Sequence, residues 1–141
     1  MKTKPILSWM ITVALLIGSW SCSKTEYFKS ESKIKEQLLG SWNLIPIPRT
    51  NPPETWIFSD ASIVRQKAPS YNTEPVPYDT ATFTVNTSML KVEIKIDNFK
   101  VLLDELNGTW QVVSLDDDFL VIATDHDGTS GILQREFQKR K

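Results

Sequence analysis

The chain has 141 residues, with 16 Lys and Arg against 17 Asp and Glu, so its formal net charge at pH 7 is −1. This balance lacks the basic excess with which nucleic-acid-binding proteins contact phosphates, and we expect no nucleic-acid partner. The length suits one domain. A single cysteine, Cys22, excludes a disulfide within the chain.

The first 21 residues have the three parts of a secretory signal. Lys2 and Lys4 form a basic start, residues 6–17 (ILSWMITVALLI) are apolar, and small residues follow at 18, 19 and 21. The apolar run is too short for a transmembrane helix, which needs about 20 residues to cross the hydrocarbon core. We therefore predict that residues 1–21 are removed and that the processed chain begins at Cys22, with a net charge of −3 after the loss of the two lysines.

The residues around Cys22 resemble the signal of bacterial lipoproteins, in which a box of small residues precedes a cysteine that is acylated and becomes the new N-terminus. The resemblance implies lipid attachment at Cys22, with residues 22–31 as a lipidated tether to the membrane. Two or three acyl chains anchor a protein stably, whereas one binds only marginally. Ser23 stands where many such proteins carry an aspartate that retains them at the inner membrane, so we expect the outer membrane. The alternative is an ordinary signal peptide that leaves a free thiol.

A short helix is expected at the start of the domain that spans residues 32–141. Ser30 or Ser32 can cap its first turn and Gly40 can end it. Its apolar residues fall at helical spacing: Ile34, Leu38 and Leu39.

After residue 40 the apolar pattern changes to the two-residue period of β-strands. Residues 89–96 (MLKVEIKI) and 79–85 (DTATFTV) each place apolar side chains on one face and polar ones on the other. The predicted strands are 41–47, 54–58, 61–66, 79–85, 89–96, 99–105, 109–115, 119–124 and 131–138.

The connections between these strands are mostly short and polar, which favours pairing between strands adjacent in sequence. Asn107-Gly108 is the strongest such signal, because both residues tolerate the positive φ of a type I′ hairpin turn. A meander of about eight strands exposes its edges unless it closes, so we predict an all-β fold, an up-and-down antiparallel β-barrel. A two-sheet sandwich is the alternative. Two Pro-rich connections, 46–53 and 67–78, are expected to cap one mouth of the barrel.

Three segments resemble the lipocalin-like (calycin) family, in particular the small bacterial lipocalin-like domains that follow lipoprotein signals. They are LLGSW at 38–42, ETWIFSD at 54–60 and LQREFQK at 133–139. The resemblance implies that Trp42 plugs the closed end of the barrel and that Arg135, or alternatively Arg140, packs over its indole. It also implies an interior that takes an apolar or amphipathic ligand.

The apolar residues assigned to inward faces are the candidates for lining such a ligand site. Ordinary core packing would use the same residues, and eight strands enclose an interior just wide enough for side chains or for one small ligand. The candidates are Trp56, Phe58, Phe83, Val85, Leu90, Val92 and Ile94.

The sequence has few residues suited to catalysis. His126, the only histidine, lies in the turn sequence TDHDG, and LDDDF at 115–119 lacks the spaced ligands of a calcium loop. Glycine-rich phosphate loops, nucleophile elbows and zinc spacings are also missing. We therefore expect no enzyme, no metal and no cofactor.

Three hypotheses of function remain open. The first is a lipoprotein that binds a small apolar or amphipathic ligand inside the barrel. The second is an accessory subunit with a filled barrel that contacts an envelope protein through loop 67–78. The third is an inhibitor that inserts such a loop into an enzyme. A ligand-dependent rise in melting temperature would distinguish the first from the others.

Overall fold

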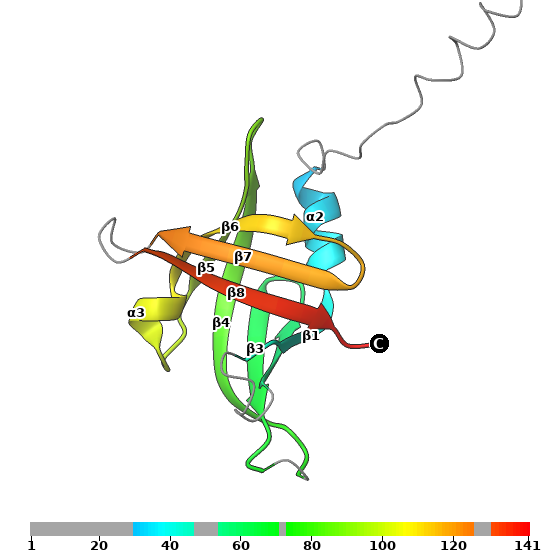
Figure 1. Cartoon of the computed structure of the whole chain (residues 1–141), viewed down its shortest axis with the longest axis vertical. Helices are drawn as coiled ribbons and strands as arrows, with labels where there is room; N and C mark the ends of the chain where they lie inside the picture. The colour runs from blue at the N-terminus through cyan, green and yellow to red at the C-terminus, as the bar shows by residue number, and fades with distance from the viewer. Residues whose placement is uncertain (1–29, 47–53, 71–72, 126–130) are drawn as a thin grey trace, which may run out of the picture.

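The protein forms a closed barrel of eight antiparallel strands in the computed structural model, which describes residues 30–46, 54–70, 73–125 and 131–141 (Figure 1). The fold class predicted from the sequence is confirmed. Each strand pairs with its neighbours in sequence, and β1 pairs with β8 to close the sheet. In chain order the elements are α2 (Glu31–Leu38), β1 (Gly40–Leu44), β2 (Glu54–Phe58), β3 (Ser62–Lys67), β4 (Val76–Thr87), β5 (Val92–Asp97), α3 (Leu103–Leu106), β6 (Gly108–Leu115), β7 (Phe119–Asp125) and β8 (Ile132–Lys139).

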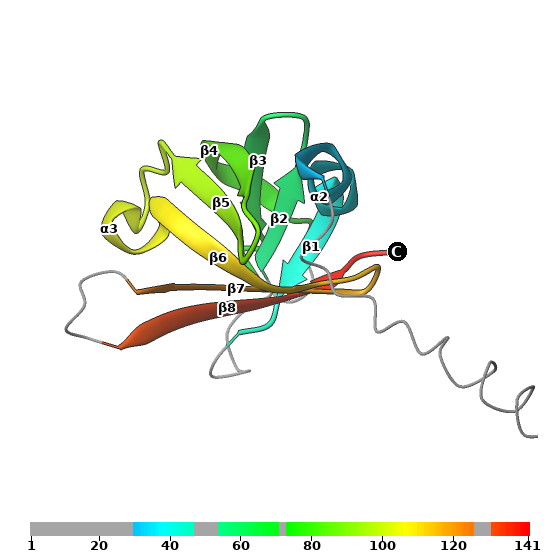
Figure 2. The same ribbon diagram turned by 90° about the horizontal axis from the view of Figure 1, so that it is seen from above.

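The barrel has two ends, which we call the closed end and the mouth. The closed end carries α2 and the turns β2–β3, β4–β5 and β6–β7. The mouth carries the connections β1–β2, β3–β4 and β7–β8 and the segment between β5 and β6 that includes α3. Helices α2 and α3 lie on opposite sides of the barrel in both views (Figures 1 and 2).

Helix α2 closes its end of the barrel with two buried side chains. Ser30 caps the helix, because its hydroxyl accepts a hydrogen bond from the backbone N–H of Lys33 at 3.3 Å. Ile34 and Leu38 are buried, one helical turn apart. The helix ends at Leu38, so Leu39 is 41% exposed and does not join the buried face that the sequence predicted for it.

The interior of the barrel is filled by aromatic and aliphatic side chains. The rings of Phe58 and Phe83 lie 5.3 Å apart, and those of Trp56 and Phe137 lie 5.0 Å apart. These spacings are typical of packed aromatic pairs. Three tryptophans are fully buried in this cluster: Trp42, Trp56 and Trp110.

The segment between β5 and β6 differs from the prediction. Residues 99–105 were predicted as a strand because apolar residues alternate there, but they form an irregular stretch and the short helix α3. Asn107-Gly108 is not a two-residue hairpin turn either. The amide of Asn107 instead accepts from the backbone N–H of Phe99 and donates to its carbonyl, both at 2.9 Å. Phe99 and Leu106 are buried, so this segment closes the mouth from inside.

Candidate functional site

Most of the residues predicted to line a ligand site are packed in one hydrophobic cluster of the barrel. All but one belong to the packed core or lie against it. Leu90 is the exception and the prediction for it is wrong: it is 83% exposed, because β5 begins at Val92 and Leu90 lies in the turn before it. The residues in the core or against it are Trp56, Phe58, Phe83, Val85, Val92 and Ile94.

Trp42 occupies the closed end, but the cation over its ring is not the predicted one. Lys139 Nζ lies 4.8 Å from the ring centroid and donates to the carbonyl of Gln37 at 3.0 Å. The prediction for Arg135 is wrong, because β8 pairs Lys139, not Arg135, with Trp42. Arg135 lies nearer the mouth and forms an ion pair of 3.3 Å with Glu105. Arg140 contacts the closed end only through its backbone N–H, which donates to Ser41.

A buried charged cluster lies just inside the mouth, and sequence reasoning missed it. Arg65 on β3 is 3% exposed. Its Nε lies 2.7 Å from Glu54 Oε1 and its Nη1 lies 3.3 Å from Asp79 Oδ2. Trp56 also donates to the same Glu54 oxygen, at 2.6 Å. Buried ion pairs of this kind persist only when hydrogen bonds satisfy both charges, as they do here.

Aromatic rings surround the Arg65 guanidinium. Its Cζ lies 4.8 Å from the ring centroid of Tyr78, 5.2 Å from Phe99 and 5.7 Å from Trp56. A β-bulge between Arg65 and Gln66 leaves Tyr78 without a partner across the strand pair, which lets both Tyr78 and Asp79 approach Arg65. The bulge thus assembles the cluster.

Asp79 attaches the β5–β6 segment to the barrel wall. Its carboxylate accepts from the backbone N–H groups of Val101 at 3.0 Å and Lys100 at 3.2 Å. Burial alone would raise the pKa of Asp79, but hydrogen bonds from Val101, Lys100 and Thr80, together with the charge of Arg65, hold that pKa below its usual range. Asp79 is therefore ionised at neutral pH.

The same cluster holds a strained backbone. Arg65 Nη1 donates to the carbonyl of Val101 at 3.1 Å. The next residue, Leu102, has a φ of +57°, which costs an L-residue with a side chain about 1–2 kcal/mol. Val101 and Leu102 remain 43% and 52% exposed. Two apolar side chains are thus held in water at the mouth, and strain of this kind is concentrated at functional sites.

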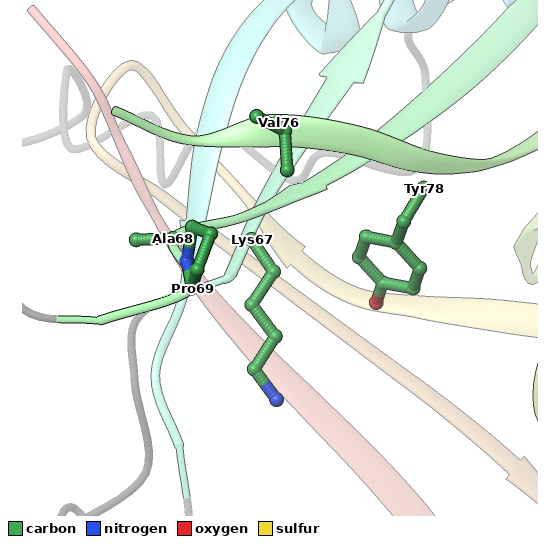
Figure 3. Close-up of a pocket in the computed structure, with 5 residues that line it drawn as sticks. All are labelled: Lys67, Ala68, Pro69, Val76 and Tyr78. Carbon is green, nitrogen blue, oxygen red and sulfur yellow. The ribbon is translucent and has the colours of Figure 1, made fainter. Parts of the chain in front are cut away.

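A pocket of about 460 Å³ lies inside the β3–β4 hairpin (Figure 3). Lys67 and Tyr78 extend in the same direction from the two strands of the hairpin. Burial, followed by the neighbouring Glu54 carboxylate, raises the pKa of Tyr78, so its hydroxyl stays protonated at neutral pH. The other residues that line the pocket are Ala68, Pro69 and Val76.

Exposed apolar residues lie in two mouth segments that both contact Arg65, and together with Lys67 we call them the mouth patch. Val76 is 50% exposed and Tyr78 is 38% exposed. Lys67 makes no ion pair with any residue in the described ranges, so it is the free charge beside this apolar surface. The mouth patch consists of Lys67, Val76, Tyr78, Val101 and Leu102.

Several sequence-derived predictions lie outside the described residues. They include Cys22 with the whole signal segment, residues 47–53, residues 71–72 of the predicted loop 67–78, and His126. In the part of the chain that the structure describes, no three His, Cys, Asp or Glu side chains are grouped to hold a metal ion. No helix among the described residues has the length and hydrophobicity needed to cross a membrane.

Comparisons with protein-family models, with curated proteins and with solved structures found no match. Arguments about the function of this chain therefore depend on its own site. Two sequence signals could have found that site. Arg65 shares the inward face of its strand with Ile63, and residues 106–110 repeat the Leu-x-Gly-x-Trp pattern of residues 38–42.

Proposed function

We propose that the protein is a non-catalytic outer-membrane lipoprotein, anchored through acylated Cys22, whose lipocalin-like barrel binds another protein of the cell envelope at the mouth patch. The packed interior carries this proposal. Trp56, Phe58 and Phe83, which would line a ligand cavity, contact one another, and the Arg65 cluster occupies the space above them. Recognition is therefore assigned to the surface and not to the interior.

The mouth patch favours a partner with a defined chemistry. Its pocket has the size of a typical site for a small group, and apolar atoms of Val76, Pro69 and Ala68 form its walls. Lys67, which makes no ion pair with any described residue, adds a positive charge at the edge. A protein segment with a large apolar side chain next to an Asp or Glu would satisfy both features.

The buried cluster supports this assignment because it fixes the shape of the patch before any partner binds. Asp79 and Arg65 hold both backbone groups of Val101, and Leu102 keeps its strained conformation beside it. A surface that is already ordered loses less conformational entropy on binding. The exposure of two apolar residues on a strained segment is hard to explain by stability alone.

A second candidate is a small amphipathic anion in the mouth pocket. The same apolar walls and the same Lys67 would hold its tail and its charged group. It would bind at the mouth and not within the barrel. The two candidates differ in the mass of the bound species. The mass of the adduct formed in the crosslinking experiment below distinguishes them.

We would place a photo-crosslinking amino acid at Val76 in the full chain, expressed in its own cells, and at Val113 as the control. Val113 is 57% exposed on β6 and lines a separate pocket that shares no residue with the mouth pocket. We expect one protein adduct at position 76 that is absent at position 113 and that is lost when Lys67→Glu is added. Equal adduct yields at both positions would contradict the proposal. So would an adduct at position 76 whose yield is unchanged by Lys67→Glu.

The anchor is tested separately. Metabolic labelling with an alkyne fatty acid should mark the wild-type chain and not Cys22→Ala, with Cys22→Ala accumulating as an uncleaved or released form. Equal labelling of both chains would refute lipid attachment at Cys22.

A further inference from the structure

The turn between β4 and β5 has an unusual composition. Ser88 and Lys91 close it, with the N–H of Ser88 donating to the carbonyl of Lys91 at 2.9 Å. Met89 and Leu90 occupy the tip, where Gly, Asn, Asp or Pro is expected for conformational reasons. They are 86% and 83% exposed, which makes them the most exposed large hydrophobic residues of the described chain.

The tip lies at the closed end, where the tether enters the domain. The carboxylate of Glu31, the first residue of α2, accepts from the backbone N–H of Thr87 at 3.3 Å. Met89 follows two residues later, so its Cα is within about 7 Å of that of Thr87. Figure 1 shows the β4–β5 hairpin extending past α2 at this end.

The tether limits how far this end can be from the membrane. Ser30 is eight residues after Cys22, a distance of at most about 29 Å even when fully extended. The mouth is at the opposite end of the barrel, so the anchor brings the tip, and not the mouth patch, to the lipid.

We propose that Met89 and Leu90 form a membrane-contact tip that inserts into the lipid surface and turns the mouth patch away from it. This inference rests on the proposed lipid anchor for its setting. The turn presents two apolar side chains, and Lys91 beside them, which pairs with Glu93 at 2.6 Å, places a charged pair at the base of the tip. Insertion would add to the anchor in the same way as additional acyl carbons do, because both remove apolar surface from water.

The test isolates the tip from the question of natural acylation. The chain that begins at Cys22 keeps every described element, and its only thiol can be coupled to one 14-carbon alkyl maleimide. A single chain of that length binds membranes marginally and reversibly, so a further contribution is measurable. Partition to vesicles of phosphatidylethanolamine and phosphatidylglycerol is then measured by sedimentation for the parent and its variants.

The tip variant carries Met89→Ser and Leu90→Ser. We expect its partition coefficient to fall about tenfold, because each large apolar side chain that enters the lipid favours binding by removing its surface from water. The matched control carries Val101→Ser and Leu102→Ser, another adjacent exposed apolar pair, at the mouth. We expect its partition to equal that of the parent. Unchanged partition of the tip variant, or an equal fall in both variants, would overturn the inference.

The proposed anchor can fail without affecting this result, because the alkyl chain is attached chemically. Failure of the anchor would appear in the labelling of Cys22 in cells, and failure of the tip only in the vesicle measurement. A melting curve of each variant confirms that the barrel is intact.

Discussion

The two ends of the barrel are closed by the same five-residue pattern, Leu-x-Gly-Ser/Thr-Trp, at 38–42 and at 106–110. In both, a helix ends at the leucine, and the glycine begins a strand with a positive φ, +116° at Gly40 and +129° at Gly108. The tryptophan then enters the core. Its indole N–H donates to the leucine carbonyl, at 2.7 Å for Trp42 and 3.0 Å for Trp110.

The ends differ in how charge is added to this pattern. At the closed end one cation, Lys139, lies over Trp42. At the mouth a buried cation is held by two carboxylates and three rings. The tryptophan pattern is therefore a structural motif common to both ends, whereas the Arg65 cluster is an additional feature of the mouth, where we propose that a partner binds.

The largest expected effect separates the two cations. Arg65→Met should lower the free energy of unfolding by about 3–5 kcal/mol, because it leaves two buried carboxylates without their partner. Lys139→Met should cost about 0.5–2 kcal/mol, the value of a cation–π contact. Urea unfolding of the two variants measures both. Losses of equal size would contradict the distinction between the ends.

The shared pattern predicts similar effects at both tryptophans. Trp42→Phe and Trp110→Phe each keep an aromatic ring but remove the donor to the helix carbonyl. Each should cost about 1–3 kcal/mol, since a buried acceptor is left unsatisfied. Chemical unfolding of the pair gives the comparison. If one substitution lowers the free energy of unfolding and the other leaves it unchanged, the two copies of the pattern do not contribute equally to stability.

Replacing either glycine of the pattern by alanine should lower the stability of the protein by a similar amount, and by less than the tryptophan substitutions do. At Gly40 an added Cβ would have room, with its nearest neighbour Lys139 Cε at 3.5 Å, so Gly40→Ala tests backbone strain alone. We expect Gly40→Ala and Gly108→Ala each to lower stability by about 1–2 kcal/mol. Thermal unfolding measures the change, and unaltered melting temperatures would refute the requirement for positive φ.

The smallest expected effect is the pH dependence of the mouth. The pKa of Asp79 is lower in the folded state than in the unfolded state, so its contribution is fully present above the ordinary Asp pKa of about 3.9. It is lost as pH falls through the folded pKa. Urea midpoints at a series of pH values below 5 should fall less steeply for Asp79→Asn than for the parent. Lys139→Met should keep the slope of the parent, and a flattened slope there would contradict the assignment.

The barrel was predictable because its strands alternate and its connections are short. Eight of the nine predicted strands overlap the eight strands of the barrel, and the two-residue period identified the inward faces of residues such as Phe83 and Ile94. The short connections favoured closure. The failures of the prediction have local causes. Residues 99–105 alternate like a strand, but Phe99 is held by the Asn107 amide, and the register of β8, which selects Lys139 over Arg135, depends on pairing that no single strand encodes.

The mouth site could be predicted only in part, for a related reason. Arg65 at an inward position of its strand was a visible signal, but only the register of β2, β3 and β4 places it beside Glu54 and Asp79. The bulge that turns Tyr78 toward Arg65 has no clear sequence signal. The repeated Leu-x-Gly-Ser/Thr-Trp pattern was visible in the sequence, and it would have indicated that 106–110 follows a helix.

The central claim is that the barrel interior is filled and that binding occurs at the mouth. Native mass spectrometry of the chain purified from the cells that produce it tests it directly. We predict the mass of the polypeptide, with any covalent modification, alone or with a bound species that Val76→Asp abolishes. A small molecule that is released on gentle activation and is retained by Val76→Asp would place a ligand inside the barrel and contradict the account.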